Sequence, residues 1–306
     1  MPSARVLVTG GRGFLGRHLL DRARAEGIPV VEARGDLRRL EDARVAVAEG
    51  RPAAVLHLAS ARPSRAGGPT AALADNARMA ASVIDAVAEL APEAPVLIPG
   101  SAAQYGLGGP EPLAESTPQS PIGAYGAAKL ALETAWLASD RVRVIWARTF
   151  NLLGPRQPAG APVADWALSL ARAERGGPRA IRTGPLDRVR DFLDVRDAVD
   201  AYMALLSGPA RGAVNVCSGR PRGLREIAEA LAALASVEVS LEPEPPSAGS
   251  ALDPRCVVGD PRRLRSMTGW EPARALEESL RDVLADARAR TAGEQRERTA
   301  AMAART

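Results

Sequence analysis

The sequence predicts an α/β protein, with a doubly wound parallel sheet followed by a smaller, mixed domain at the C-terminal end. In the first half of the chain, short aliphatic runs alternate with alanine-rich segments of helical character. A glycine cluster separates the first such run from the first helical segment. After about residue 154, proline and glycine become frequent and the alternation loosens. Strands of near-continuous apolar character that alternate with helices are typical of a parallel sheet covered on both faces.

The apolar runs of the first half predict five strands joined by helices. We expect these elements, within residues 1–154, to form one domain. The strands are predicted at 5–9, 29–33, 53–59, 95–99 and 143–147. The helices are predicted at 14–26, 40–49, 70–91 and 121–139.

The second half of the chain shows a looser pattern. The segment 187–216 is expected to return to the first domain, while 155–186 and 217–290 form the smaller domain. The charged, alanine-rich end, 291–306, is expected to fray. Helices are predicted at 163–175, from about 196 to 206, at 223–235 and from 276, and a strand at 213–217.

Composition and charge exclude several classes of protein. The 306 residues include 46% apolar and 25% charged ones, as in ordinary globular proteins. Although the pI is about 9.6, the net charge is only +4 and aromatic residues make up 3%, so we expect no nucleic-acid partner. No apolar run approaches about 18 residues and no signal peptide precedes the first strand, which predicts a cytoplasmic protein without a membrane partner. Cys217 and Cys256 lack metal-ligand spacing, so no metal site is expected.

Glycines at positions 10, 13 and 16 lie between the first predicted strand and the first predicted helix. Gly10 permits a tight turn, Gly13 lets a pyrophosphate approach backbone N–H groups at the helix N-terminus, and Gly16 allows close packing of helix and strand. The spacing alone is weak evidence. Its place between strand and helix predicts a Rossmann-type dinucleotide site.

Lysine occurs once in the chain, at Lys129, among 40 lysine and arginine residues. An ammonium group is compact and shifts its pKa readily, whereas a guanidinium stays protonated, so this exception indicates chemistry that arginine cannot perform. Tyr125 lies four positions earlier and shares a helix face with Lys129. A cation at this place lowers the pKa of a phenol from about 10 toward neutrality, as general acid–base catalysis by tyrosine requires. Taken alone, the pair is equally compatible with a chance spacing on a solvated helix.

Motifs spread over about residues 4–287 resemble the extended short-chain dehydrogenases/reductases, the NAD-dependent epimerase/dehydratase family of nucleotide-sugar enzymes. Within this family, residues 184–197 look most like the branch of the GDP-mannose 4,6-dehydratases and the GDP-4-keto-6-deoxymannose reductases. The matching motifs are Thr9–Gly16, Ser101–Gly106, Tyr125-xxx-Lys129, Arg148–Pro155, Arg190–Phe192, Asn215–Gly219 and Gly269–Pro272.

The resemblance implies a role for each member of a Ser/Tyr/Lys set. Tyr125 is the general acid or base toward the sugar hydroxyl or carbonyl, and Lys129 lowers its pKa while binding the nicotinamide ribose. Ser101 hydrogen-bonds the same oxygen. Three donors around one oxygen form a small site that stabilises negative charge beside the hydride carrier. His57, near the end of a buried strand, is expected to be structural rather than a catalytic base.

The resemblance also implies which residues bind the dinucleotide. NADP(H) is favoured, because Arg34 takes the place of the acidic residue that would hold the ribose 2′-hydroxyl of NAD. Arg34 and Arg12 would clamp a 2′-phosphate, whereas Glu32 on the same strand leaves NAD(H) open. Asn76 matches the family's helix asparagine, with a helix cap as the alternative. The expected cofactor contacts are Gly10, Arg12, Gly13, Phe14, Leu15, Gly16, Arg34, Asp36, Leu37, Leu58, Ala59, Asn76, Tyr125 and Lys129.

A nucleotide-sugar substrate is expected beside the Ser/Tyr/Lys set. Asn151 and Arg190 would face its pyrophosphate, and Asp191 would neutralise a neighbouring arginine. The family places a diphosphate-binding arginine shortly before the aspartate that matches Asp260, and here that place falls near Ser250. Either a nearby arginine substitutes, or the pyrophosphate is held differently. The expected substrate contacts, with Arg255 as the substitute, are Ala102, Asn151, Arg190 and Arg255.

The expected reaction follows from what the serine motif lacks. A 4,6-dehydratase needs extra carboxylates directly after the serine, and here these positions are Ala102 and Ala103. The resemblance therefore favours reduction of the C4 ketone of an NDP-4-keto-6-deoxyhexose to an NDP-6-deoxyhexose. An NDP-sugar 4-epimerase with tightly bound NAD is the first alternative, because it needs the same set. A non-catalytic nucleotide sensor is the second, and the intact set argues against it. In the family, helices that match 76–91 and 121–139 form an interface, so a homodimer is expected.

Overall fold

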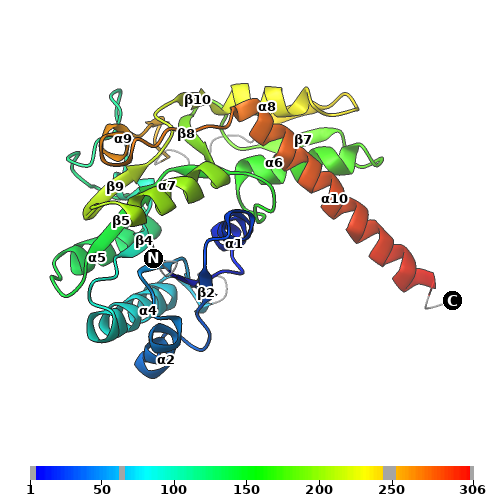
Figure 1. Cartoon of the computed structure of the whole chain (residues 1–306). Coiled ribbons are helices and arrows are strands. Elements are labelled where there is room, and N and C mark those ends of the chain that lie inside the picture. The colour runs from blue at the N-terminus through cyan, green and yellow to red at the C-terminus, as the bar shows by residue number, and fades with distance from the viewer. Residues whose placement is uncertain (1–4, 62–65, 244–252, 304–306) are drawn as a thin grey trace.

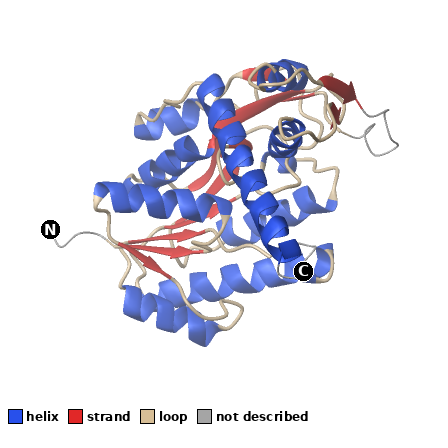
Figure 2. Cartoon of the chain, turned by 90° about the vertical axis from the view of Figure 1, so that its right-hand side faces the viewer, coloured by secondary structure: helices blue, strands red, loops and turns tan. Residues whose placement is uncertain are grey.

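The computed structural model describes residues 5–61, 66–243 and 253–303. Its largest sheet is built from β1 (Val6–Thr9), β2 (Val30–Glu32), β3 (Ala54–His57), β4 (Val96–Pro99), β5 (Val144–Thr149) and β9 (Gly212–Val216). These six strands are parallel, in the order β2-β1-β3-β4-β5-β9, with helices on both faces (Figure 1, Figure 2). The arrangement confirms the predicted doubly wound, Rossmann-type fold.

Helices cover both faces of this sheet. One face carries α1 (Phe14–Glu26) and α7 (Val195–Ser207), and the other carries α2 (Leu40–Gly50), α4 (Pro69–Leu90) and α5 (Ala124–Leu137). Leu7 of β1 packs on the side of α2 and α4, whereas its neighbours Val6 and Val8 pack on the side of α1 and α7. Successive strand residues point to opposite faces, so burial of both faces explains why the strands are continuously apolar.

The strand order reverses at β1, which lies between β2 and β3. At such a switch point a crevice opens beyond the carboxyl ends of the strands. Gly10 has a φ of 69°, and a Cβ there would lie 2.6 Å from the backbone nitrogen of Ala59, just after β3. A Cβ on Gly16 would lie 2.4 Å from the carbonyl oxygen of Gly10. Both positions therefore require glycine, because backbone atoms leave no room for a side chain.

The other elements form a smaller lobe. Its sheets contain β6 (Asn151–Leu153), β7 (Ala180–Thr183), β8 (Val189–Asp194), β10 (Pro221–Gly223), β11 (Ser240–Pro243) and β12 (Cys256–Val257). Its helices are α6 (Pro162–Ala173), α8 (Leu224–Ala232), α9 (Arg262–Thr268) and α10 (Leu276–Ala303). Strand β8 pairs with β6, β10 and β12, while β7 pairs with β11. Side chains of α6, α8 and α10 share one apolar core, whereas α9 packs against α7 and β9.

Helix α10 is longer than the sequence analysis expected. It continues to Ala303, through most of the segment that was expected to fray, and its last part extends away from the rest of the chain (Figure 1). The physical reason is composition: residues 276–303 contain no proline and a single glycine, and are rich in the helix formers alanine, arginine and glutamate. Neither α10 nor any other helix in the described ranges is long and apolar enough to cross a membrane.

Leu284 tests the contribution of α10 to the smaller lobe, because its side chain is fully buried in the shared core. We expect Leu284→Ala to lower the free energy of unfolding by about 2–5 kcal/mol, since the cavity left behind refills only partly. Val45→Ala is the control, because Val45 is 54% exposed on α2, and it should change that free energy by less than about 0.5 kcal/mol. Urea denaturation followed by circular dichroism measures both. Equal midpoints for the two variants would contradict this packing.

Candidate active site

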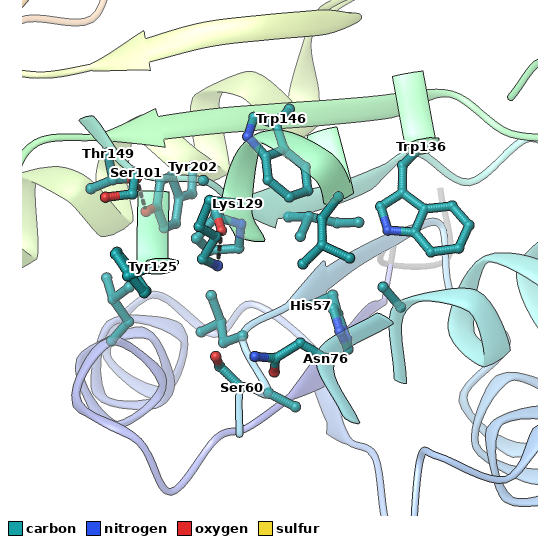
Figure 3. Close-up of a pocket in the computed structure, with 18 of the residues that line it drawn as sticks. His57, Ser60, Asn76, Ser101, Tyr125, Lys129, Trp136, Trp146, Thr149 and Tyr202 are labelled. Atoms are coloured by element: carbon teal, nitrogen blue, oxygen red, sulfur yellow. Dashed lines mark hydrogen bonds between the residues drawn. The ribbon is translucent and has the colours of Figure 1, made fainter. Parts of the chain in front are cut away.

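A cleft opens at the carboxyl edge of the large sheet, beside the glycine loop between β1 and α1. Its volume is about 1170 Å³, and it adjoins an inner pocket of about 290 Å³. Asn76, Tyr125 and Lys129 line both cavities, and Ser101 lines the inner pocket (Figure 3). The fold thus brings the Ser/Tyr/Lys set together beside the glycine loop.

Helix α5 presents Tyr125 and Lys129 one turn apart. The Lys129 Nζ donates a hydrogen bond to the carbonyl oxygen of Pro99 at the end of β4, at 2.8 Å, and lies 5.9 Å from the centre of the Trp146 ring. Figure 3 shows Lys129 between Tyr125 and Trp146. Burial lowers the pKa of Lys129 to about 8, because a charged amine loses hydration there. The only lysine of the chain is therefore an anchored amine that can lose its proton near neutral pH.

Ser101 follows β4 and begins a short 3₁₀ turn, η1 (Ala102–Gln104). Burial of the Tyr125 hydroxyl raises its pKa above the ordinary value, and a hydrogen bond with the Ser101 side chain opposes part of that rise. Tyr125 as a whole residue is 59% exposed at the mouth of the pocket. The expectation that Lys129 holds this pKa near neutrality is wrong, because the Lys129 ammonium is directed at Pro99 instead.

The predicted cofactor residues gather along the cleft, with two exceptions. Leu37 is 7% exposed, packs in the core beneath α2 and lies outside the lining of the cleft, so its contact stays a prediction. Arg34 is exposed and lies outside the lining. The predicted residues that do line the cleft are Gly10, Arg12, Gly13, Phe14, Leu15, Gly16, Asp36, Leu58, Ala59, Asn76, Tyr125 and Lys129.

The guanidinium nearest to the expected clamp belongs to Arg38 rather than Arg34. Strand β2 ends before Arg34, and a turn at Gly35, with a φ of 90°, redirects the chain so that Asp36 and Arg38 line the cleft. Arg38 donates from Nε and Nη2 to the Asp36 carboxylate, at 2.8 and 2.7 Å, and lowers the pKa of that carboxyl to about 2. Together with Arg12, this residue gives the cleft two cations at one end.

Asn76 lies inside α4 rather than at its start, so the helix-cap alternative is wrong. Its Oδ1 accepts a hydrogen bond from the backbone N–H of Ala61, at 2.7 Å, and its Nδ2 donates to the carbonyl oxygen of Ala61, at 3.2 Å. The side chain therefore fixes the loop that follows β3 at the edge of the cleft.

The expected substrate residues already have protein partners. Asn151 donates from Nδ2 to the carbonyl oxygen of Asp191 at 3.0 Å, and Arg190 donates to the Asp253 carboxylate at 2.7 Å. Arg255 is exposed, and Ala102 is buried directly after the serine. Ser250 lies outside the described residues.

The expectation that Asp191 neutralises a neighbouring arginine is wrong. Asp191 is completely buried, and its carboxylate accepts hydrogen bonds from the backbone N–H groups of Ser218, Gly219 and Gly259, at 2.8, 2.8 and 3.2 Å. The Ser218 hydroxyl adds a bond of 2.7 Å. Burial nevertheless raises the pKa of Asp191. This carboxylate joins β8 to two loops of the smaller lobe.

Several polar residues at the site were not among the expected contacts. The hydroxyls of Thr149 and Tyr202 are 2.6 Å apart, and both residues line the inner pocket. Arg156 also lines the cleft, although it lies just beyond the motif Arg148–Pro155 and was not an expected contact. His57 pairs through Nδ1 with the Thr9 hydroxyl at 2.9 Å, and burial lowers its pKa to about 4, which leaves a neutral ring.

The cleft has the features that a dinucleotide needs. The glycines leave the backbone at the N-terminus of α1 uncovered, and the first turn of α1 contains no acidic residue. Unpaired N–H groups and the helix dipole at such a terminus favour phosphate groups. Arg12 and Arg38 at the same end supply further positive charge for an anionic ligand.

Comparison with known proteins decides the family. The model of the NAD dependent epimerase/dehydratase family matches residues 6–217. The chain belongs to this family. It is 34% identical to the GDP-6-deoxy-D-mannose reductase of Pseudomonas aeruginosa, over 92% of this chain and 96% of that enzyme.

Two solved structures extend the comparison. RMD from Pseudomonas aeruginosa, complexed with NADPH, is 32% identical and superposes with a TM-score of 0.85, over 94% of this chain and 98% of that one. The UDP-glucose 4-epimerase of Thermus thermophilus, complexed with NAD, is 26% identical and has a TM-score of 0.79, over 93% and 99%. The chain therefore shares its fold with RMD complexed with NADPH and with an epimerase complexed with NAD.

The single lysine allows a direct test of its pKa. We expect the rate of acylation of Lys129 by an amine-reactive reagent to rise with pH and level off above about 8, because only the neutral amine reacts and burial depresses the pKa. Peptide mass spectrometry separates this product from that of the N-terminal amine. Lys129→Arg is the control for background labelling. A rate that keeps rising toward the ordinary lysine pKa would contradict the proposed environment.

Proposed function

We propose that this protein reduces the C4 ketone of a nucleotide-linked 4-keto-6-deoxyhexose to an alcohol, with NADPH as the hydride donor. The observation that carries the proposal is the convergence of Ser101, Tyr125 and Lys129 in a pocket continuous with the glycine-loop cleft. Similarity to GDP-6-deoxy-D-mannose reductase, and to a structure complexed with NADPH, supports it.

The lining of the inner pocket favours reduction over dehydration. Elimination of water from a sugar requires groups that remove a carbon-bound proton and protonate the leaving hydroxyl. Among the described residues that line this pocket, none is Asp or Glu, and Ser101 is followed by Ala102 and Ala103. Addition of a hydride and a proton to a carbonyl needs a reduced nicotinamide as the hydride donor and, from the protein, only the groups that are present.

Each member of the set then has a defined task. Bound NADPH supplies a hydride to the carbonyl carbon. Tyr125 donates its hydroxyl proton to the carbonyl oxygen, and its raised pKa keeps it in the protonated form that a donor requires. Ser101 donates a hydrogen bond to the same oxygen and stabilises its developing negative charge. A proton from solvent then restores the phenol, while Lys129, anchored at Pro99 beside the same pocket, would bind the nicotinamide ribose.

The test is reduction with purified components. GDP- and dTDP-linked 4-keto-6-deoxyhexoses are prepared with separate dehydratases, and the absorbance of the reduced nicotinamide is followed after addition of this protein and NADPH. We expect one NADPH to be consumed for each NDP-6-deoxyhexose formed. Tyr125→Phe should lower kcat by roughly 10²–10⁴-fold, because it removes the proton donor. Lys129→Arg should also abolish turnover while circular dichroism shows an intact fold.

Two results would contradict the proposal. Absence of NADPH oxidation with either substrate, together with C4 inversion of an unmodified nucleotide hexose without added cofactor, would establish the epimerase instead. A Lys129→Arg variant with a kcat near that of the wild type would remove the role given to the lysine.

Cofactor choice is expected to depend on two of the four arginines that line the cleft, Arg12 and Arg38. We expect a higher kcat/KM for NADPH than for NADH, because Arg12 and Arg38 can bind a 2′-phosphate bidentately. Arg12→Ala and Arg38→Ala should each lower kcat/KM for NADPH by roughly 10- to 100-fold, as the loss of a charge-assisted hydrogen bond implies, with little effect for NADH. Arg34→Ala is the matched control, because Arg34 is exposed outside the cleft. A clear preference of the wild type for NADH would discard the clamp.

Two predictions about the whole protein remain. A homodimer through α4 and α5 is expected from the family resemblance, and their many alanines permit close approach of a second helix pair. A cytoplasmic location is expected from the sequence.

A further inference from the structure

Gln104, at the end of η1, is completely buried directly behind the serine of the pocket. Its Oε1 accepts hydrogen bonds from the backbone N–H of Ser101 at 3.0 Å and from the indole N–H of Trp146 at 3.1 Å. Its Nε2 donates to Gln119 Oε1 at 2.9 Å and to Glu133 Oε2 at 2.6 Å. A primary amide offers two donor hydrogens and one oxygen with two lone pairs, so every hydrogen-bonding position of this side chain is used.

These contacts fix Ser101 at two atoms. Its backbone N–H is bound by Gln104, and its Oγ accepts a hydrogen bond from the backbone N–H of Ala103 at 3.2 Å. The pair forms a reciprocal capping box, an arrangement that ordinarily begins a longer helix but here begins a turn of three residues. Because one lone pair of the hydroxyl is engaged by Ala103, its hydrogen remains for donation toward Tyr125 or a substrate oxygen.

The other end of Gln104 reaches α5, the helix that carries Tyr125 and Lys129. Glu133, one turn after Lys129, accepts from Gln104 and makes a two-point contact with Arg148 of β5, through Nε at 3.0 Å and through Nη2. Both side chains of this ion pair are 5% exposed. Buried charges are tolerated only when geometry and hydrogen bonds are complete, so this pair allows α5 little freedom.

Trp146 supplies a second connection between the same parts. Its indole N–H donates to Gln104, while its ring lies 5.9 Å from the Lys129 Nζ (Figure 3). An aromatic face at this distance attracts an ammonium group. One amide therefore links the serine, the lysine-bearing helix and the ring beside the lysine.

We propose that Gln104 is a positioning residue that holds Ser101 in register with Tyr125 and Lys129. The inference rests on the proposed function, in which both hydroxyls act on one carbonyl oxygen. A misplacement of about 1 Å at a reacting centre lowers the rate by roughly 10²-fold, so register between two separate segments matters. Position 104 requires an amide, because an apolar side chain would leave the Ser101 N–H unpaired and a carboxylate would face Glu133.

Gln119 offers a matched control of the same residue type. It accepts from Gln104 at 2.9 Å and donates from Nε2 to Glu133 Oε1 at 3.1 Å. Its described contacts do not include Ser101. Replacement of Gln119 thus disturbs the same buried cluster without releasing the serine.

The first experiment compares Gln104→Met, Gln119→Met, Ser101→Ala and the double variant Ser101→Ala/Gln104→Met. We expect Gln104→Met to lower kcat by roughly 10- to 100-fold with little change in KM, and Gln119→Met to remain near the wild type. The double variant should be no slower than the slower single variant, because Gln104 acts through Ser101. Losses that multiply in the double variant, or equal losses in both glutamine variants, would overturn the proposal.

A second measurement needs no turnover. The ionisation of Tyr125 is followed by tyrosinate absorbance in the near ultraviolet, and Tyr125→Phe identifies its step. Since the hydrogen bond from Ser101 lowers the pKa of Tyr125, Gln104→Met should raise the midpoint as Ser101→Ala does, and Gln119→Met should not. An unchanged midpoint in Gln104→Met would overturn the positioning role. An inactive wild type with the expected shifts would instead overturn the proposed function alone.

A reciprocal exchange covers the case in which Gln104→Met fails to fold. Gln104→Glu keeps an acceptor for Ser101 but places a second carboxylate against Glu133, so kcat should fall. Addition of Glu133→Gln restores one amide facing one carboxylate and keeps one negative charge in the cluster beside Arg148, so part of the lost kcat should return although the two-point contact with Arg148 is lost. A double variant no faster than Gln104→Glu would contradict coupling through this contact.

Discussion

The catalytic end of the cleft depends on the buried ion pair between Glu133 and Arg148. It joins α5 to β5, and its remaining hydrogen-bonding groups are satisfied by neighbours: Arg148 also donates to the Tyr105 hydroxyl at 2.8 Å and to the carbonyl oxygen of Glu115 at 3.0 Å. Loss of one partner from such a pair costs about 3–5 kcal/mol, because the other charge stays buried alone. The ion pair therefore anchors α5, the helix that carries Tyr125, to β5.

Most of the larger sheet could be predicted because its signals are local. Each strand is a short aliphatic run, most of the helices that cover the sheet are rich in alanine, and the glycine loop marks a place where the chain passes close to another strand. The small lobe offered no such signal. Strands β6, β10 and β12 contain only two or three residues, too few to show a period, and each exists because it pairs with β8.

The residue types of the site were predictable, whereas their partners were not. Motifs at the carboxyl ends of parallel strands meet at one edge, so their order in the sequence was enough to bring the Ser/Tyr/Lys set together. Arg38 rather than Arg34 lines the cleft because the chain bends at Gly35. The environment of Asp191 was set by backbone N–H groups from loops remote in sequence, which side-chain types do not encode.

If Arg190 binds substrate as predicted, its pairing with Asp253 would make binding depend on the charge of the anion. The Asp253 carboxylate binds Arg190 at 2.7 Å and Arg188 at 3.1 Å. An anion that binds Arg190 competes with this carboxylate for the same positive charge, so its affinity is a difference between two ion pairs rather than the strength of one. A monovalent anion such as chloride gains nothing from the exchange. A diphosphate carries more charge and more acceptor oxygens than the Asp253 carboxylate. It would therefore bind Arg190 where abundant small ions would not.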